Sequence, residues 1–181
     1  IATTRDLRGR SLAGQNLCSQ DLRAADLVAC NLEAANLSEC ELTGASMHNA
    51  RMRRATLTSA VLEGVEARDI DLENADLTGA VMRRSDFRSA IFLEADLRNA
   101  DLTGANLEGA DLRGASLTGA ILDGACLDGA DLAGAKLDGI SMVELSAKSA
   151  RIRGIGGTEL ADRLRMAGAQ SRPPLAIGKW S

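Results

Sequence analysis

An apolar residue recurs at every fifth position of this chain, and this spacing restricts the fold more than any other feature. The thirty positions from 7 to 152 hold 21 Leu, 4 Met, 2 Phe, 2 Ala and 1 Ile, without one shift of register. A period of five matches neither the ~3.6 residues of an α-helical turn nor the two-residue alternation of a β-strand. It is typical of a solenoid, in which each unit buries its side chains only by stacking on the next unit.

The other positions of the five-residue unit follow rules as well. Two residues before each apolar centre, Ala occupies 19 of the 26 sites between residues 25 and 150. This predicts a narrow tube that one large and one small side chain fill in every unit. Two residues after the centre, Gly appears 14 times. Since Gly adopts positive φ without steric cost, we expect each unit to end in a type II turn.

Asp or Asn commonly precedes the centre, as in Ala-Asp-Leu at residues 110–112 and Ala-Asn-Leu at residues 105–107. These units resemble the A-(D/N)-L-x-G unit of the pentapeptide-repeat family, and the resemblance covers residues 5–154. It implies an all-β solenoid, namely a right-handed quadrilateral β-helix with four units per coil. The repeats then make about 7.5 coils, and a stacking distance of ~4.8 Å gives a rod of roughly 36 Å.

The chain is expected to divide into two parts. Residues 1–154 form the β-helix, and residues 155–181 form a short C-terminal capping helix and a tail. The first coil is interpreted as an N-terminal cap, because its inward small-residue sites are all polar and discourage end-to-end growth. These sites are Arg5, Arg10, Gln15 and Gln20. The helix is predicted from one apolar stripe, which would cover the last coil and consists of Leu160, Leu164 and Ala167.

Composition and motifs argue against catalysis, cofactors and direct nucleic-acid binding. A net charge of −4 and a pI near 5.1 lack the basic footprint that nonspecific nucleic-acid binding needs. The four cysteines form no CxxC motif and no Cys/His pair, so neither a zinc site nor a disulfide framework is expected. The single histidine, His48, lies outward on a turn, and a filled tube offers no substrate pocket. No stretch is long and apolar enough to span a membrane.

Outward apolar residues indicate candidate partner-binding positions. Val61 and Val81 are expected to stack on one wall, while Ile91 and Leu93 flank Phe92 on the opposite wall. They are equally consistent with tolerated surface residues of a solenoid. Trp180 in the tail is the only tryptophan, and it could anchor against the rod or on a partner.

An acidic section offers a second kind of candidate surface. Residues 94–144 hold ten acidic and three basic side chains, a net charge of −7, at a density along the rod similar to that of duplex DNA. This points to the family branch that shields DNA gyrase from quinolones by imitating DNA. Three acids lie outside the Asp/Asn consensus position and are therefore predicted to be replaceable without disturbing the repeat: Glu108, Asp123 and Asp128. However, gyrase-directed members tend to carry Phe at many centres, and here only Phe87 and Phe92 occur.

The photosynthetic branch of the family is the alternative that the sequence favours. The chain resembles its members in the Leu centres, the uninterrupted rod and a first residue other than Met, which is expected of a mature protein after presequence removal. The resemblance implies a non-enzymatic scaffold that docks on a larger protein complex, such as a membrane photosynthetic complex. The expected compartment is the thylakoid lumen, with the bacterial cytoplasm as the alternative. A homodimer through the C-terminal end is a further expectation.

Overall fold

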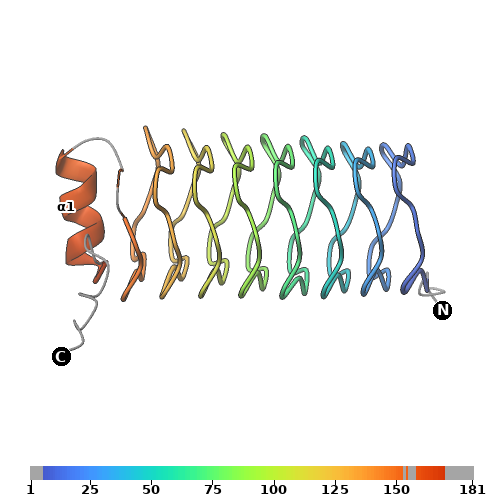
Figure 1. Ribbon diagram of the computed structural model, residues 1–181, viewed down its shortest axis with the longest axis horizontal. Helices are drawn as coiled ribbons and strands as arrows, with labels where there is room; N and C mark the ends of the chain where they lie inside the picture. Colours follow the sequence, from blue (N-terminus) through green and yellow to red (C-terminus); the bar gives the residue numbers. More distant parts are fainter. Residues whose placement is uncertain (1–5, 153, 155–157, 170–181) are drawn as a thin grey trace, which may run out of the picture.

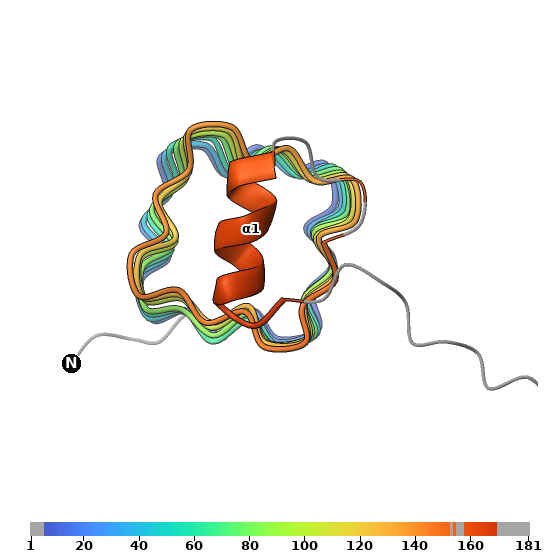
Figure 2. The ribbon, with the colours of Figure 1, turned by 90° about the vertical axis from the view of Figure 1, so that its left-hand side faces the viewer.

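The computed structural model describes residues 6–152, 154 and 158–169, and it shows a straight rod that ends in one helix (Figure 1). Seen along the rod, every coil has four sides (Figure 2). Parallel bridges join residues that are 20 positions apart, from Asp6 with Asp26 to Asp131 with Arg151. This register assigns four five-residue units to each coil and confirms the four-sided β-helix.

The walls are held together by single bridge residues rather than by long strands. In each unit the residue before the centre forms the bridge, and the two residues after the centre form the turn. At Asp101, for example, the backbone N–H donates to the Ala80 carbonyl at 2.9 Å, and the N–H of Leu102 donates to the Ile121 carbonyl at 2.8 Å. Each coil therefore depends on both neighbouring coils for its backbone hydrogen bonds.

The interior contains the centres and the small residues, as the sequence predicts. Every centre from Leu22 to Ile152 is at most 7% exposed. Full burial of one such Leu or Phe side chain contributes about 1.5–3 kcal/mol. The two phenylalanines pack edge to face, with ring centroids of Phe87 and Phe92 5.4 Å apart. Ala67, a small residue at a centre, stands one coil before Phe87 in the same column and is completely buried as well.

Positive φ occurs at all thirty turn corners from residue 9 to residue 154, of which 14 are Gly and 16 are other residues. The turn that the sequence predicts at the end of every unit is therefore present throughout, but Gly accounts for its positive φ at only 14 of the corners. Ala24, Ala29 and Ala34 adopt φ values of 52–54° although the left-handed region costs an L-residue about 1–2 kcal/mol. The backbone hydrogen bonds of the turn and of the neighbouring coils therefore outweigh local preference at these corners.

The turn at Val65 departs from the common hydrogen-bonding pattern. Wherever Ala holds the small-residue site from Ala25 to Ala150, its N–H donates to the preceding centre carbonyl at 2.8–3.1 Å. No such bond joins Val65 to Leu62 within the described residues. Instead, the Ser85 hydroxyl of the next coil donates to the Leu62 carbonyl at 2.6 Å and accepts the Val65 N–H at 3.2 Å. The Ser85 hydroxyl therefore bridges the two backbone groups that this turn leaves without a direct bond.

The two ends of the rod differ. At the N-terminal end, the polar side chains predicted to cap the tube are exposed (Arg10, Gln15 and Gln20), while the centres of that coil are partly buried (Leu7, Leu12 and Leu17). Arg5 lies outside the described residues. The exposed polar residues are consistent with a cap, whose effect on end-to-end growth stays a prediction.

At the C-terminal end, helix α1 (Thr158–Met166) lies across the open end of the last coil (Figure 2). Its Leu164 is completely buried. After the helix the chain returns to the edge of the last coil, where the carbonyls of Ala167 and Gly168 accept the N–H groups of Ala147 (3.1 Å) and Ser149 (3.0 Å). Part of one wall is thereby continued beyond the repeats.

Candidate partner-binding surfaces

The structure places the predicted apolar residues on two separate walls. Val61 and Val81 form a bridge with each other and are partly buried. Ile91 bridges Asp71 and Asp111 on the opposite wall, next to the partly buried Leu93. The four residues therefore form two small patches rather than one surface, and Trp180 lies outside the described residues.

Two outward apolar residues near the C-terminal end were missed by the sequence reasoning. Ile121 is 38% exposed and Val143 is 60% exposed; with Met166 of α1 they are the exposed large apolar residues of the described chain. Ile121 lies in the column of Val61 and Val81, two coils further on, and Val143 follows on the same wall in the next coil. The 20-residue register, extended past Val81, would have found Ile121, whereas Val143 lies two residues outside that register, in the column of Asp123.

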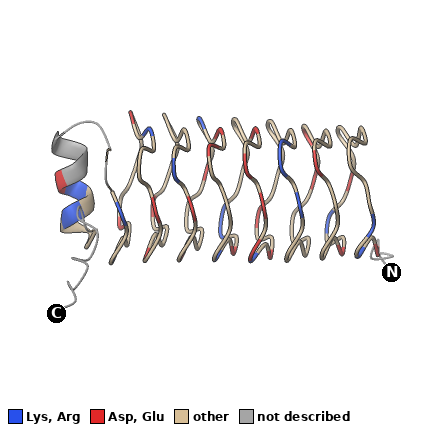
Figure 3. Cartoon of the chain, viewed as in Figure 1, with Lys and Arg blue, Asp and Glu red and all other residues tan. Residues whose placement is uncertain are grey.

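Charges of both signs alternate along the rod, because arginines pair with the consensus aspartates (Figure 3). Of the ten acidic side chains between residues 94 and 144, four form ion pairs with arginine at 2.5–3.4 Å: Asp96 with Arg98, Asp101 with Arg83, Asp111 with Arg113, and Asp131 with Arg151. Two of these arginines, Arg83 and Arg151, lie outside the acidic section. The section is therefore less like a continuous line of anions than its net charge of −7 suggests.

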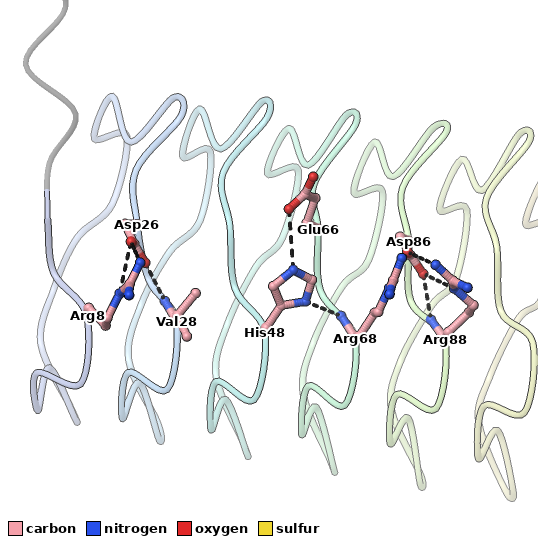
Figure 4. A network of polar contacts seen from close by, with 8 residues as sticks. All are labelled: Arg8, Asp26, Val28, His48, Glu66, Arg68, Asp86 and Arg88. Carbon is pink, nitrogen blue, oxygen red and sulfur yellow. Dashed lines mark hydrogen bonds and ion pairs between the residues drawn. The ribbon is translucent and has the colours of Figure 1, made fainter.

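Asp86 shows how tightly such pairs are held. Arg88 donates to both of its oxygens (2.9 and 2.7 Å), and Arg68 of the preceding coil donates to Oδ2 at 2.7 Å (Figure 4). The hydrogen bonds from Arg88, and then those from Arg68, hold the pKa of Asp86 well below its usual range. Asp86 also accepts the N–H of Arg88 in its own turn at 3.3 Å. The consensus carboxylate thus caps a turn and fixes arginines at the same time.

Asp123 and Asp128 have a structural role that the sequence reasoning did not foresee. Asp123 Oδ1 accepts the Ser141 hydroxyl (2.6 Å) and the Val143 N–H (2.8 Å) of the next coil. Asp128 makes the corresponding bonds to Ser146 (2.7 Å) and Lys148 (2.8 Å). The expectation that these two acids can be replaced without disturbing the repeat is therefore wrong. In both turns Ser stands at the consensus position, and the aspartate one coil earlier accepts the turn N–H in its place.

His48 also accepts a backbone N–H from a turn of the next coil. Its Nδ1 accepts the Arg68 N–H at 3.2 Å, and its Nε2 lies 3.3 Å from Glu66 Oε2 (Figure 4). Glu66 stands where Asp or Asn would cap this turn. The only histidine therefore has a structural explanation, and nothing about its contacts indicates acid–base catalysis.

Glu108 is the one DNA-mimic candidate for which no structural side-chain contact was found in the described part of the chain. It lies beside a shallow surface groove of about 360 Å³ that is lined by Arg68, Asp69, Arg88, Ser89, Glu108 and Gly109. The two basic and two acidic side chains of this lining cancel in charge. The groove therefore shows no preference for an anionic or a cationic ligand.

The remaining chemistry-bearing groups belong to the core. The thiols of Cys30 and Cys40 are buried and donate to the carbonyls of Leu7 (2.7 Å) and Leu17 (2.8 Å), and burial raises the pKa of both. All four cysteines are free. The described residues contain no group of three His, Cys, Asp or Glu side chains that could hold a metal ion. Nor does any described helix have the length and apolarity to cross a membrane.

A four-sided β-helix built from five-residue units, with a filled interior, defines a class of solenoid proteins. The profile of the family described as pentapeptide repeats matches residues 25–64, 68–104 and 95–134, in eight copies. The chain belongs to this family, whose members fold as right-handed quadrilateral β-helices. No curated protein matched the sequence.

Several solved structures are similar to the chain. QnrB1, a plasmid-mediated fluoroquinolone resistance protein, is 16% identical with a TM-score of 0.46, over 92% of this chain and 98% of that chain. HetL, a pentapeptide-repeat protein involved in heterocyst differentiation regulation in the cyanobacterium Nostoc sp. strain PCC 7120, is 32% identical with a TM-score of 0.28. The match covers 83% of this chain and 79% of that chain. A pentapeptide-repeat protein from the Arabidopsis thaliana thylakoid lumen is 23% identical with a TM-score of 0.26, over 91% of this chain and 81% of that chain.

Proposed function

We propose that this protein is a non-enzymatic scaffold, a rod of about 7.5 coils that docks on a larger protein complex through one wall. The observation that supports this proposal is the pairing of Val61 with Val81, which places two outward apolar side chains in register on a rigid wall. Apolar side chains of this kind carry binding energy at protein interfaces, whereas exposed charges mainly affect rate and salt response. Ile91 and Leu93 form the second candidate patch, on the opposite wall.

The partner that we propose is a thylakoid-lumenal photosynthetic complex, with a complex of the bacterial cytoplasm as the alternative. This choice follows from the Leu-centred repeats. A homodimer through the C-terminal end, where Met166 is 89% exposed, is the proposed oligomeric state. Sedimentation of the purified chain over a range of concentrations tests the dimer.

The docking proposal is tested by quantitative copurification from the native source. The double variant Val61→Lys/Val81→Lys is expected to lose the partner by roughly 30-fold, which corresponds to about 2 kcal/mol for a central apolar contact. The matched control is Val28→Lys, because Val28 is also an outward, partly buried valine but lies on the adjacent wall. Equal loss in the control, or no loss in the double variant, would refute docking through this patch.

A second candidate function is DNA mimicry towards gyrase, and the net charge of the acidic section favours it. The test is gyrase supercoiling in the presence of the purified protein. Because Asp123 and Asp128 support turns, the charge reversal is better made at Glu108 and Asp138, whose side chains are exposed. Inhibition or quinolone protection that Glu108→Lys/Asp138→Lys abolishes would replace the scaffold proposal. No effect on gyrase would exclude mimicry and leave the scaffold.

A further inference from the structure

An uncovered apolar patch lies on one wall near the C-terminal end of the rod. It consists of Ile121 and Val143, which stand on adjacent coils of the same wall and are 38% and 60% exposed. Neighbouring backbone positions hold them in place, since Ile121 bridges Ser141 and the Val143 N–H is bonded to Asp123. The two side chains lie at diagonal positions of neighbouring coils, with the hydrogen-bonded pair of Asp123 and Ser141 at the other two positions. Outward apolar side chains that the backbone fixes in this way form a preformed binding surface.

The rim of this patch is acidic. Asp123 lies one coil below Val143 in the same column, and the exposed Glu144 follows Val143 at the corner. Hydrogen bonds from Ser141 and from the Val143 N–H lower the pKa of Asp123, so it is negatively charged at neutral pH. A segment that binds here should combine apolar side chains with positive charge and carry few acidic groups.

The C-terminal tail of the same chain has this composition and starts at this end of the rod. Just before the last described residue, Ala169, the carbonyls of Ala167 and Gly168 accept the N–H groups of Ala147 and Ser149, on the wall adjacent to that of Val143. The twelve residues that follow Ala169 contain three large apolar side chains and two basic ones, with no Asp or Glu: Leu175, Ile177, Trp180, Arg172 and Lys179.

The reach of the tail is sufficient. Twelve residues span up to about 40 Å when extended. The patch lies on the last two coils, which are ~4.8 Å apart, and one wall of about five residues separates it from the point where the tail begins. No second molecule is needed to bring the two together.

We propose that residues 170–181 dock back onto the rod, with apolar side chains of the tail on Ile121 and Val143 and basic side chains at the acidic rim. This contact is independent of the proposed scaffold function, because it is made within one chain. It leaves the Val61–Val81 part of the same wall free for an external partner.

Because Trp180 is the only tryptophan, its fluorescence in the full-length chain reports on the tail alone. Docking predicts an emission maximum at shorter wavelength, and weaker quenching by acrylamide, than for a synthetic peptide of residues 170–181. Val143→Ser and Ile121→Ser should each shift both readouts towards the values of the free peptide. The matched control is Leu93→Ser, an outward apolar residue on the opposite wall, which should change neither.

The proposal is overturned by any of three results. The first is a wild-type chain whose emission and quenching equal those of the free peptide. The second is a docked indole that responds to Leu93→Ser instead of Val143→Ser. The third is an emission maximum that moves to longer wavelength on dilution, which would show that the tail binds a second copy. Circular dichroism of every variant checks that the rod remains folded.

Discussion

Replacing Ser85 by Ala is expected to destabilise the protein, although Ala is the residue that the repeat favours at this position. Ser85 is 1% exposed, and its hydroxyl is the only group that joins the Val65 N–H to the Leu62 carbonyl within the described residues. Ala would remove both bonds. It would leave one backbone donor and one backbone acceptor without partners at the interior of a closed tube.

The magnitude follows from these two groups. Leaving a buried donor or acceptor unsatisfied costs about 1–3 kcal/mol each. Since the turn can partly close and recover some of this energy, we expect the free energy of unfolding to fall by about 2–4 kcal/mol. Urea unfolding measures the loss, with the midpoint lowered and the slope unchanged if the unfolded surface stays the same.

Two further variants make the test specific. Cys40→Ala is the matched control, because its thiol donates to the Leu17 carbonyl, which already accepts the Gln20 N–H at 3.1 Å. It should cost less than about 1 kcal/mol. Ser85→Ala in a Val65→Ala background should cost much less than in the wild type, since Ala at residue 65 allows the turn to close as it does elsewhere. An unchanged cost in that background, or a neutral Ser85→Ala, would refute the bridging role of the hydroxyl.

Three other outcomes are expected. The pKa of Asp86 is lower in the folded protein than in the unfolded chain, where it is about 3.9. Asp86 therefore stabilises the fold at a pH above about 3.9, and this contribution is lost as the pH falls below that value. The midpoint of thermal unfolding should decline less at acidic pH in Arg88→Gln than in the wild type. Asp123→Ala should lower the midpoint of urea unfolding, because the Ser141 hydroxyl and the Val143 N–H lose their acceptor, whereas Glu108→Ala should leave the midpoint nearly unchanged. Ala29→Gly should raise the free energy of unfolding by about 0.5–1 kcal/mol, because Gly adopts positive φ without the steric cost that Ala has. The midpoint of thermal unfolding should rise accordingly, and a lower midpoint would contradict this.

The fold could be predicted from the sequence because the same packing problem recurs in every unit. Each centre has to fill the tube next to one small residue, so a single period determines the interior, the turns and the stacking. The repeat predicts the corners at non-Gly residues as well, but Ala24 and Ala29 have no local preference for positive φ and adopt it because the neighbouring coils impose it.

The candidate site could be predicted less well, because it depends on combinations of departures from the repeat. The role of Asp123 follows from Ser141, and that of His48 follows from Glu66, each about one coil further along the chain. Neither residue is informative alone. The exposure of Val143 likewise depends on the absence of a further coil above its wall, which a local pattern does not show.

The 20-residue register has a consequence for how such a gene can change in length. Loss or gain of one five-residue unit in the middle of the rod would turn everything downstream by a quarter of a revolution (Figure 2). The tube would still close, but Ile121 and Val143 would move to a different wall from Val61 and Val81. Asp123 would keep its bonds to Ser141 and Val143, because all three residues lie downstream of the change. Only insertions and deletions of a whole coil keep all faces aligned. A change in length by one five-residue unit is therefore compatible with folding, whereas a surface that spans several coils is kept only when the length changes by four units at once.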